Sequence, residues 1–223
     1  MKVILFGATG MVGRGVLRQC LLDPGVEAVL AVGRKPSGET HPKLRDLIRP
    51  DMFDVDGTAD ELRGYDACFF CLGVSSVGMK EAEYRHLTYD LTLAWAHALA
   101  PEHPGLRFLY VSGMNTNGTA MWARVKKQTE DDLLALFPRA IMIRLGALRP
   151  MHGERSKAPG AGVLLTLLSP LWPVAQALWP SGVITTEELG RAMLRAARED
   201  GRQGGEKRVL ESRDLVALGR APR

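Results

Sequence analysis

Hydrophobic and polar residues follow one another along this chain in blocks that predict strands and helices in regular succession. Six short, nearly continuous apolar runs predict strands, at residues 3–6, 26–32, 52–55, 67–72, 106–111 and 140–145. Between them, apolar residues at helical spacing predict helices at residues 12–22, 59–63, 81–100 and 122–137. The segment 44–48 fits either a short helix or a strand. Pro101 and Pro138 end the last two helices.

Strands and helices that alternate in this way favour parallel β-α-β units. We therefore predict an α/β fold, a Rossmann-type doubly wound parallel sheet with helices on both faces. A chain of 223 residues is long enough for one such domain with a sizeable core. A separate second domain would be cramped, so we expect residues 1–223 to form a single domain.

The region after Pro150 has a different composition. Residues 158–186 include no charged residue, but Pro170, Pro173 and Pro180 interrupt the run. Its uninterrupted pieces are shorter than the roughly 20 residues that a membrane span needs. We expect residues 150–190 to form an apolar, broken helical lid or a contact between subunits, rather than an anchor on a membrane surface.

The C-terminal part of the chain contains one strong helix signal. The residues Thr-Thr-Glu-Glu at 185–188 predict the capped start of a helix that runs to about residue 197. Residues 208–211 fit a last strand. The arginines that follow are expected to form a solvated end, at Arg213, Arg220 and Arg223.

A glycine-rich turn lies between the first predicted strand and the first predicted helix. Such a turn points backbone N–H groups and the positive end of a helix at an anion, most often a dinucleotide pyrophosphate. A turn that only connects two elements is the alternative, but the strand before it and the helix after it favour a nucleotide site. The residues expected at the pyrophosphate are Gly7, Thr9, Gly10, Met11, Val12 and Gly13.

The residues after the second strand bear on which dinucleotide is bound. In an NAD site, an Asp or Glu about 20 residues beyond the glycines binds the ribose hydroxyls. Here the strand is followed by Gly33, Arg34 and Lys35, with no acid. Arginine binds a phosphate through two parallel hydrogen bonds and can stack on adenine. We therefore predict NADP(H) over NAD(H), with Arg34 on the 2′-phosphate and Lys35 assisting.

Position alone suggests a residue for the adenine. Asp54 ends the third predicted strand, and Asp56 is a close alternative. Ligands of doubly wound sheets bind beyond the carboxyl ends of the strands, so one cleft should collect these residues and the glycine turn. The other segments expected at that edge are 71–76, 112–118 and 146–150.

Charge and the remaining residue types exclude several classes of function. The net charge of +4 is mild, and no basic tract has interleaved aromatics, so nucleic-acid binding is not expected. The histidines have no metal-ligand spacing, and we expect no metal. Cys68 and Cys71 lie three residues apart on one predicted strand, about 10 Å apart and facing opposite ways. A disulfide needs Cα atoms within about 7 Å, so the pair is interpreted as structural. No secretory signal peptide is visible, and we expect a cytoplasmic protein.

Four segments together resemble an atypical short-chain dehydrogenase/reductase. They are the glycine turn 7–13, Cys-Leu-Gly at 71–73, Val-Ser at 111–112 and Trp-Ala-Arg-Val-Lys at 122–126. The resemblance is to the NAD(P)H-binding, NAD-dependent epimerase/dehydratase-like proteins related to the human tumour suppressor TIP30, and it covers about residues 1–150. It implies a dinucleotide cofactor, with Cys71, Leu72 and Gly73 among the residues beside it.

The resemblance also implies a reaction centre. In that superfamily a Ser after the fifth strand holds the substrate oxygen. A Tyr-x-x-x-Lys on the next helix supplies the proton and binds the ribose. Ser112 and Lys126 match this pattern, but Trp122 stands at the tyrosine position. An indole N–H can donate a hydrogen bond, but it is not an acid or base at neutral pH. Structural roles are the alternatives, with Trp122 as a core aromatic and Ser112 as a strand-end hydroxyl.

The tryptophan leaves three outcomes open. Hydride transfer can use water or an activated acceptor such as a quinone or enone, or the site can bind cofactor without turnover. In the third, another residue supplies the proton, with Tyr84, Tyr89 and His152 as candidates. The sequence thus predicts an NADP(H)-dependent oxidoreductase for a small carbonyl, enone or quinone. The alternative is a non-catalytic, cofactor-sensing regulator or assembly factor. We expect a small-molecule substrate and a monomer or homodimer.

Overall fold

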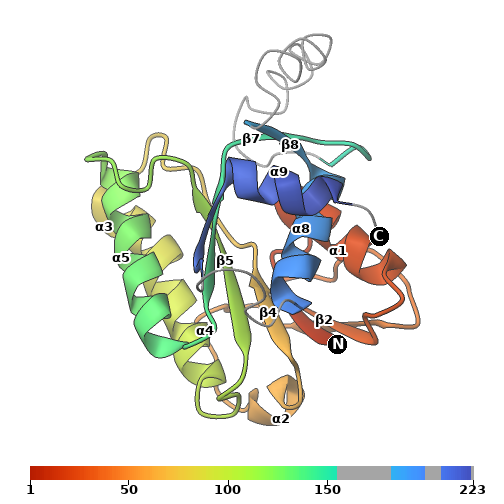
Figure 1. Ribbon diagram of the computed structural model, residues 1–223. Helices are drawn as coiled ribbons and strands as arrows, with labels where there is room; N and C mark the ends of the chain where they lie inside the picture. The colour runs from red at the N-terminus through yellow and green to blue at the C-terminus, as the bar shows by residue number, and fades with distance from the viewer. Residues whose placement is uncertain (155–181, 199–206, 222–223) are drawn as a thin grey trace.

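The computed structural model describes residues 1–154, 182–198 and 207–221 (Figure 1). In this part of the chain seven strands form one parallel sheet, in the order β3-β2-β1-β4-β5-β6-β9. Their bounds are β1 Lys2–Phe6, β2 Ala28–Gly33, β3 Leu44–Ile48, β4 Ala67–Phe70, β5 Arg107–Gly113, β6 Ile141–Leu145 and β9 Val209–Glu211. The predicted doubly wound Rossmann-type sheet is confirmed.

Helices cover both faces of the sheet (Figure 1). One face carries α1 (Met11–Leu22), α8 (Thr186–Arg198) and α9 (Ser212–Arg220). The other carries α4 (Leu91–Leu99) and α5 (Met121–Leu136). The helix predicted over 81–100 is one continuous run of α3 (Glu81–Arg85), the π-helical turn η1 (His86–Asp90) and α4. The short helix α2 (Ala59–Leu62) lies on the same face of the sheet as α4.

The apolar runs in the sequence reflect burial on both faces. Val3 and Leu5 of β1 pack beneath α1 and α8, whereas Ile4 and Phe6 pack beneath α4. All four are 0% exposed. Side chains alternate between the two faces of a strand, so a strand covered twice is apolar at every position.

The strand predicted at residues 52–55 is wrong. The third strand is β3, at 44–48, and residues 52–55 form a loop. The carbonyl of Met52 accepts a hydrogen bond of 2.8 Å from the indole nitrogen of Trp95, a side chain of a helix, rather than from a neighbouring strand. Met52 is buried there, which explains the apolar pattern. β3 lies at the edge of the sheet, where polar residues are tolerated and the strand signal is weak.

A second, two-stranded sheet was not predicted. It pairs β7 (Ala147–Arg149) with β8 (Val183–Thr185) in parallel, so these two segments lie side by side although they are far apart in the sequence. Residues 155–181, which hold most of the predicted lid, lie outside the described residues. Within the described chain, no helix combines the length and apolar character that crossing a membrane demands.

The C-terminal helices are capped by local side chains. The predicted box at the start of α8 is confirmed, with the Thr185 hydroxyl accepting from Glu188 N at 3.1 Å and the Glu188 carboxylate accepting from Thr185 N at 2.8 Å. The prediction of a solvated C-terminal end is wrong in one respect. Helix α9 forms there, and the Arg220 guanidinium lies 2.7 Å from the Glu188 carboxylate. Arg213 is exposed, and Arg223 lies outside the described residues.

Candidate functional site

The turn between β1 and α1 is closed by two glycines. Gly7 has φ +82°, a conformation that favours glycine, and a Cβ there would lie 2.8 Å from the carbonyl carbon of Cys71. A Cβ on Gly13 would lie 2.1 Å from the oxygen of Gly7. Both positions therefore require glycine for the packing of the chain against itself.

Gly10 differs from the other two glycines. The nearest atom to a Cβ there would be the Gly7 oxygen, at 3.4 Å, an ordinary contact distance, so the packing of the chain does not itself require glycine at this position. Gly10 also precedes α1, whose first turn has neither a side-chain cap nor an acid. A helix start leaves backbone N–H groups without partners in the helix, and these attract an anion. The glycine turn and the start of α1 therefore fit a pyrophosphate that approaches the backbone at Gly10.

The segment after β4 lies directly beside this turn. Cys71 N donates a hydrogen bond of 3.1 Å to Phe6 O, and Gly7 approaches the backbone of Cys71 and Leu72. Leu72 is half-buried and Gly73 is exposed. The structure thus brings the predicted residues of the two loops together at the carboxyl edge of the sheet.

The cysteines behave as the sequence indicates for a structural pair. Cys20, Cys68 and Cys71 are free thiols. Burial raises the pKa of each thiol, for Cys20 to about 12, so the reactive thiolate is disfavoured. Within the described residues, no three His, Cys, Asp or Glu side chains gather in a way that could hold a metal ion.

Two cations follow the second strand at the same edge. Arg34 and Lys35 come directly after β2 and are both exposed. Neither forms an ion pair with any residue that the structure describes. Both are therefore available to an anionic ligand, and their assignment to a 2′-phosphate stays a prediction.

Asp54 is not at a strand end, because the strand predicted there does not form. It lies exposed in the loop after β3, 3.6 Å from the guanidinium of Arg49. Its carboxylate also accepts a hydrogen bond of 3.3 Å from Asp56 N. The loop still follows the carboxyl end of β3, but the positional argument for Asp54 over Asp56 is lost. An adenine contact by either residue stays a prediction.

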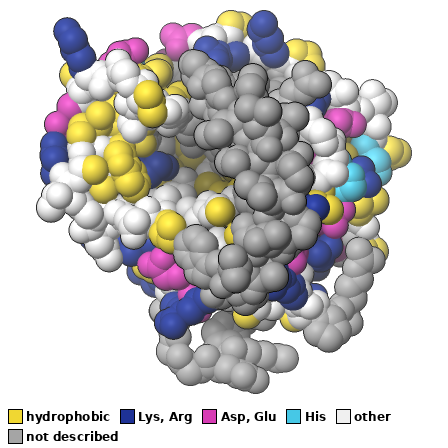
Figure 2. Space-filling view, turned by 90° about the horizontal axis from the view of Figure 1, so that it is seen from above, with side chains coloured by type: hydrophobic (Ala, Val, Ile, Leu, Met, Phe, Trp, Pro, Cys, Tyr) yellow, Lys and Arg dark blue, Asp and Glu magenta, His cyan; other side chains and the backbone are white. Residues whose placement is uncertain are grey.

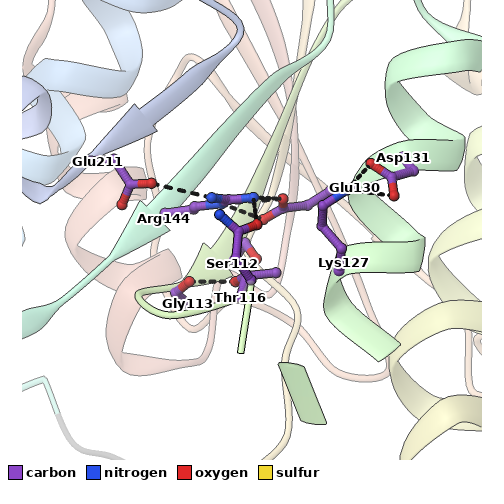
Figure 3. A network of polar contacts seen from close by, with 9 residues as sticks. Ser112, Gly113, Thr116, Lys127, Glu130, Asp131, Arg144 and Glu211 are labelled. Atoms are coloured by element: carbon purple, nitrogen blue, oxygen red, sulfur yellow. Dashed lines mark hydrogen bonds and ion pairs between the residues drawn. The ribbon is translucent and has the colours of Figure 1, made fainter. Parts of the chain in front are cut away.

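Ser112 lies near the end of β5 and is almost fully buried. Its hydroxyl lies 3.1 Å from the hydroxyl of Thr116, which in turn donates to the carbonyl of Gly113 (Figure 3). The turn that makes this contact includes Asn115, at φ +66°. The serine is therefore held by the loop between β5 and α5.

Lys126 and Trp122 lie next to the same loop. The ammonium of Lys126 is 3.3 Å from Val111 O and 3.4 Å from the Tyr110 hydroxyl. Burial lowers the pKa of Lys126, and nearby negative charge partly opposes this shift. The ring of Trp122 packs on the backbone of Gly113. The three residues predicted for the reaction centre are thus brought together.

A buried ion pair beside the site was not predicted. Arg144 of β6, 8% exposed, lies 2.6 Å from Glu130 of α5, 1% exposed (Figure 3). Arg144 also contacts Glu211 at 3.2 Å and donates to the Asn117 side chain at 3.0 Å. Ser112 is its neighbour in the sheet. The one sequence signal was an arginine inside an otherwise apolar strand.

Comparison with known proteins finds no matching family model. Curated relatives do match along nearly the whole chain. Protein FMP52-1, mitochondrial, of Scheffersomyces stipitis is 27% identical over 98% of each chain. Protein fmp52-2, mitochondrial, of Aspergillus oryzae is 27% identical, over 97% of this chain and 96% of its own. These names contradict the expected cytoplasmic location. That expectation relied on a missing secretory signal, which does not separate cytoplasm from organelle.

Solved structures share the fold. A UDP-N-acetylglucosamine 4-epimerase from Methanobrevibacter ruminantium has a TM-score of 0.69 and 16% identity, over 89% of this chain and 73% of its own. The Bordetella bronchiseptica enzyme WbmF, in complex with NAD+, has a TM-score of 0.68 and 17% identity, over 100% of this chain and 81% of its own. The chain therefore has the Rossmann-type fold of these solved structures.

Proposed function

We propose that this protein is an NADP(H)-dependent oxidoreductase of the atypical short-chain type, related to TIP30, that reduces a small carbonyl, enone or quinone. The glycine turn carries the proposal, because the packing of the chain requires glycine at Gly7 and Gly13 but not at Gly10. A glycine that the chain itself does not require serves a ligand that approaches the backbone. The fold of NAD-binding enzymes supports this assignment.

Four parts of the predicted site have a role in this proposal. The start of α1 binds the pyrophosphate, and Arg34 binds the 2′-phosphate of NADP(H). Lys126 binds the ribose hydroxyls, and the Ser112 hydroxyl donates a hydrogen bond to the substrate oxygen. The bound cofactor supplies a hydride. Ser112 and Lys126 are both held by contacts to the end of β5 and its loop, which preorganises them.

The surroundings of the site favour an apolar substrate. Val77 and Val74, in the loop after β4, are 87% and 42% exposed, and Met151 is 41% exposed. Figure 2 shows the carboxyl edge from above, with hydrophobic side chains gathered on the side of α3 and α5 around a hollow. Exposed apolar side chains at such an edge are typical of a ligand-binding rim.

A second candidate function is a cofactor-sensing regulator that binds NADP(H) without turnover. The observation that favours it is Trp122, which replaces the usual proton donor and packs on Gly113. A partner protein would then recognise the loaded state.

Calorimetry and single-turnover kinetics test the proposal. We expect NADPH to bind more tightly than NADH. We also expect quinones, enones or aldehydes to oxidise the bound NADPH in one turnover. Ser112→Ala should slow the oxidation and leave NADPH binding unchanged. Binding without oxidation by any acceptor would favour the regulator, and the absence of any nucleotide binding would overturn both functions.

A further inference from the structure

The helix run that begins with α3 lies beside α5 in a fixed parallel register. Three polar contacts join side chains that are 43 positions apart in the chain. These are Glu81 with Arg124 at 2.8 Å, Arg85 with Gln128 at 2.6 Å and Tyr89 with Asp132 at 2.6 Å. The same offset places Tyr84 level with Lys127, the residue after Lys126, a little more than one helical turn beyond Trp122.

Tyr84 is buried in an unusual way. Its side chain is 2% exposed, but it belongs to neither of the two apolar clusters that pack against the sheet. Its hydroxyl makes no hydrogen bond to any residue that the structure describes. This hydroxyl is not one of the fully buried polar atoms that lack a partner, so it reaches accessible space and is available to a ligand.

The register of the two helices brings Tyr84 near Lys126, and the electrostatics agree with it. Negative charge on Tyr84 raises the pKa of Lys126, against the lowering caused by burial. Charges inside the protein are weakly screened, so such an interaction is effective there.

The other proton donors considered from the sequence are engaged elsewhere. The hydroxyl of Tyr89 donates to Asp132 at 2.6 Å. The ring of His152 contacts Glu187 of α8, on the other side of the sheet from α5. Tyr110, which the sequence did not indicate as a donor, has its hydroxyl 3.4 Å from the Lys126 ammonium, and burial raises the pKa of this hydroxyl.

We propose that the Tyr84 hydroxyl supplies the proton that Trp122 cannot, an inference that rests on the proposed carbonyl reduction. The carbonyl carbon receives the hydride, which converts NADPH into NADP+. The O–H bond of Tyr84 breaks as a new O–H bond forms on the substrate oxygen, and the product is an alcohol. The phenolate that remains regains a proton from water.

Fluorine NMR tests the location without turnover. The four tyrosines are replaced by fluorotyrosine, and the resonances are assigned with Tyr84→Phe and Tyr89→Phe. We expect NADP+ to shift the Tyr84 resonance and to leave that of Tyr89 in place, and Lys126→Met to shift the Tyr84 resonance without nucleotide. If calorimetry shows NADP+ binding and the Tyr84 resonance does not move, the inference is overturned. If calorimetry shows no binding, the proposed function itself is overturned.

Kinetics test the chemical role. With NADPH and nitrobenzaldehyde, Tyr84→Phe should lower kcat by about 10²-fold or more, the usual contribution of a general acid. Its NADPH affinity should stay unchanged, because the phenyl ring still fills the site. Tyr89→Phe, which also removes one hydroxyl from the same helix run, is the matched control and should retain the wild-type kcat. Equal kcat values for Tyr84→Phe and wild type, or a wild type that binds NADPH and reduces no aldehyde, would overturn the inference.

Discussion

The indole of Trp122 lies against Gly113, so closely that a Cβ on the glycine would be 3.3 Å from Cζ3 of the ring. Gly113 follows Ser112 directly, and Lys126 is one helical turn from Trp122 on α5. Position 122 is therefore next to both remaining members of the predicted reaction centre. We therefore expect a side chain placed there to reach the same substrate atom as Ser112.

Trp122→Tyr should raise carbonyl reductase activity, because it adds a phenol beside Lys126. The gain should be largest in a Tyr84→Phe background, where it restores about 10²-fold in kcat for nitrobenzaldehyde, the contribution of one general acid. Trp122→Phe, which adds no hydroxyl, is the control. If the tyrosine changes kcat in neither background, position 122 does not face the reacting carbonyl.

Arg34→Ala should weaken NADPH binding by about 1.5–3 kcal/mol, the range for a hydrogen bond to a charged group, and leave NADH binding nearly unchanged. The reason is that only NADPH carries the 2′-phosphate. Calorimetry with both nucleotides measures the difference. Arg18→Ala removes another exposed arginine, on α1, and should alter neither affinity. Equal losses for NADPH and NADH would contradict the assignment.

The glycine turn allows stability and binding to be separated with matched substitutions. Gly13→Ala places a methyl group 2.1 Å from Gly7 O and should lower the free energy of unfolding, by about 1–3 kcal/mol or more. Gly10→Ala meets its nearest atom at 3.4 Å and should leave the free energy of unfolding almost unchanged, but weaken NADPH binding. Urea unfolding and calorimetry on both variants check this. A Gly10→Ala protein with wild-type affinity would show that the ligand does not approach the backbone there.

Features that depend on neighbours in sequence could be predicted. The strand, glycine turn and helix at residues 2–22 need only consecutive residues, and the box at Thr185 and Glu188 needs four. The location of β3 could not be predicted, because 44–48 is a half-polar edge strand and Met52 has an apolar environment supplied by a distant helix. Apolar pattern alone does not distinguish a strand from a buried loop.

Residues of the candidate site that belong to a sequence motif could be predicted. Contacts of the site that depend on packing between distant elements could not. Ser112, Trp122 and Lys126 follow from a resemblance in sequence. The contact of Arg144 with Glu130 joins a strand and a helix 14 residues apart, and no local pattern indicates it. The location of Tyr84 beside Lys126 requires the register of two helices, which only the folded structure gives.

The buried pair of Glu130 and Arg144 should be costly to break. Glu130→Ala leaves a guanidinium that is 8% exposed without its main partner, and should lower the free energy of unfolding by about 3–5 kcal/mol. Asp131→Ala breaks the neighbouring pair with Lys127, whose side chain is 42% exposed, and should cost less than about 1 kcal/mol. Urea unfolding measures both values. The double variant Glu130→Ala with Arg144→Ala should lose less than the sum of its single changes, and strict additivity would contradict a direct interaction.

The pH dependence of stability should reveal the burial of Lys126. Burial lowers its pKa in the folded protein, so between the folded and unfolded pKa values the unfolded chain binds more protons. Stability therefore rises with pH in that alkaline window, just below the ordinary pKa of lysine, and below the window the buried charge is a constant cost. Lys126→Met should remove this rise. The difference in free energy of unfolding between this variant and the wild type, measured by urea unfolding, should therefore become smaller as pH increases. Lys127→Met, at a position whose side chain is 42% exposed, should keep the wild-type dependence. A difference between Lys126→Met and wild type that is constant across this range would show that Lys126 titrates alike in both states.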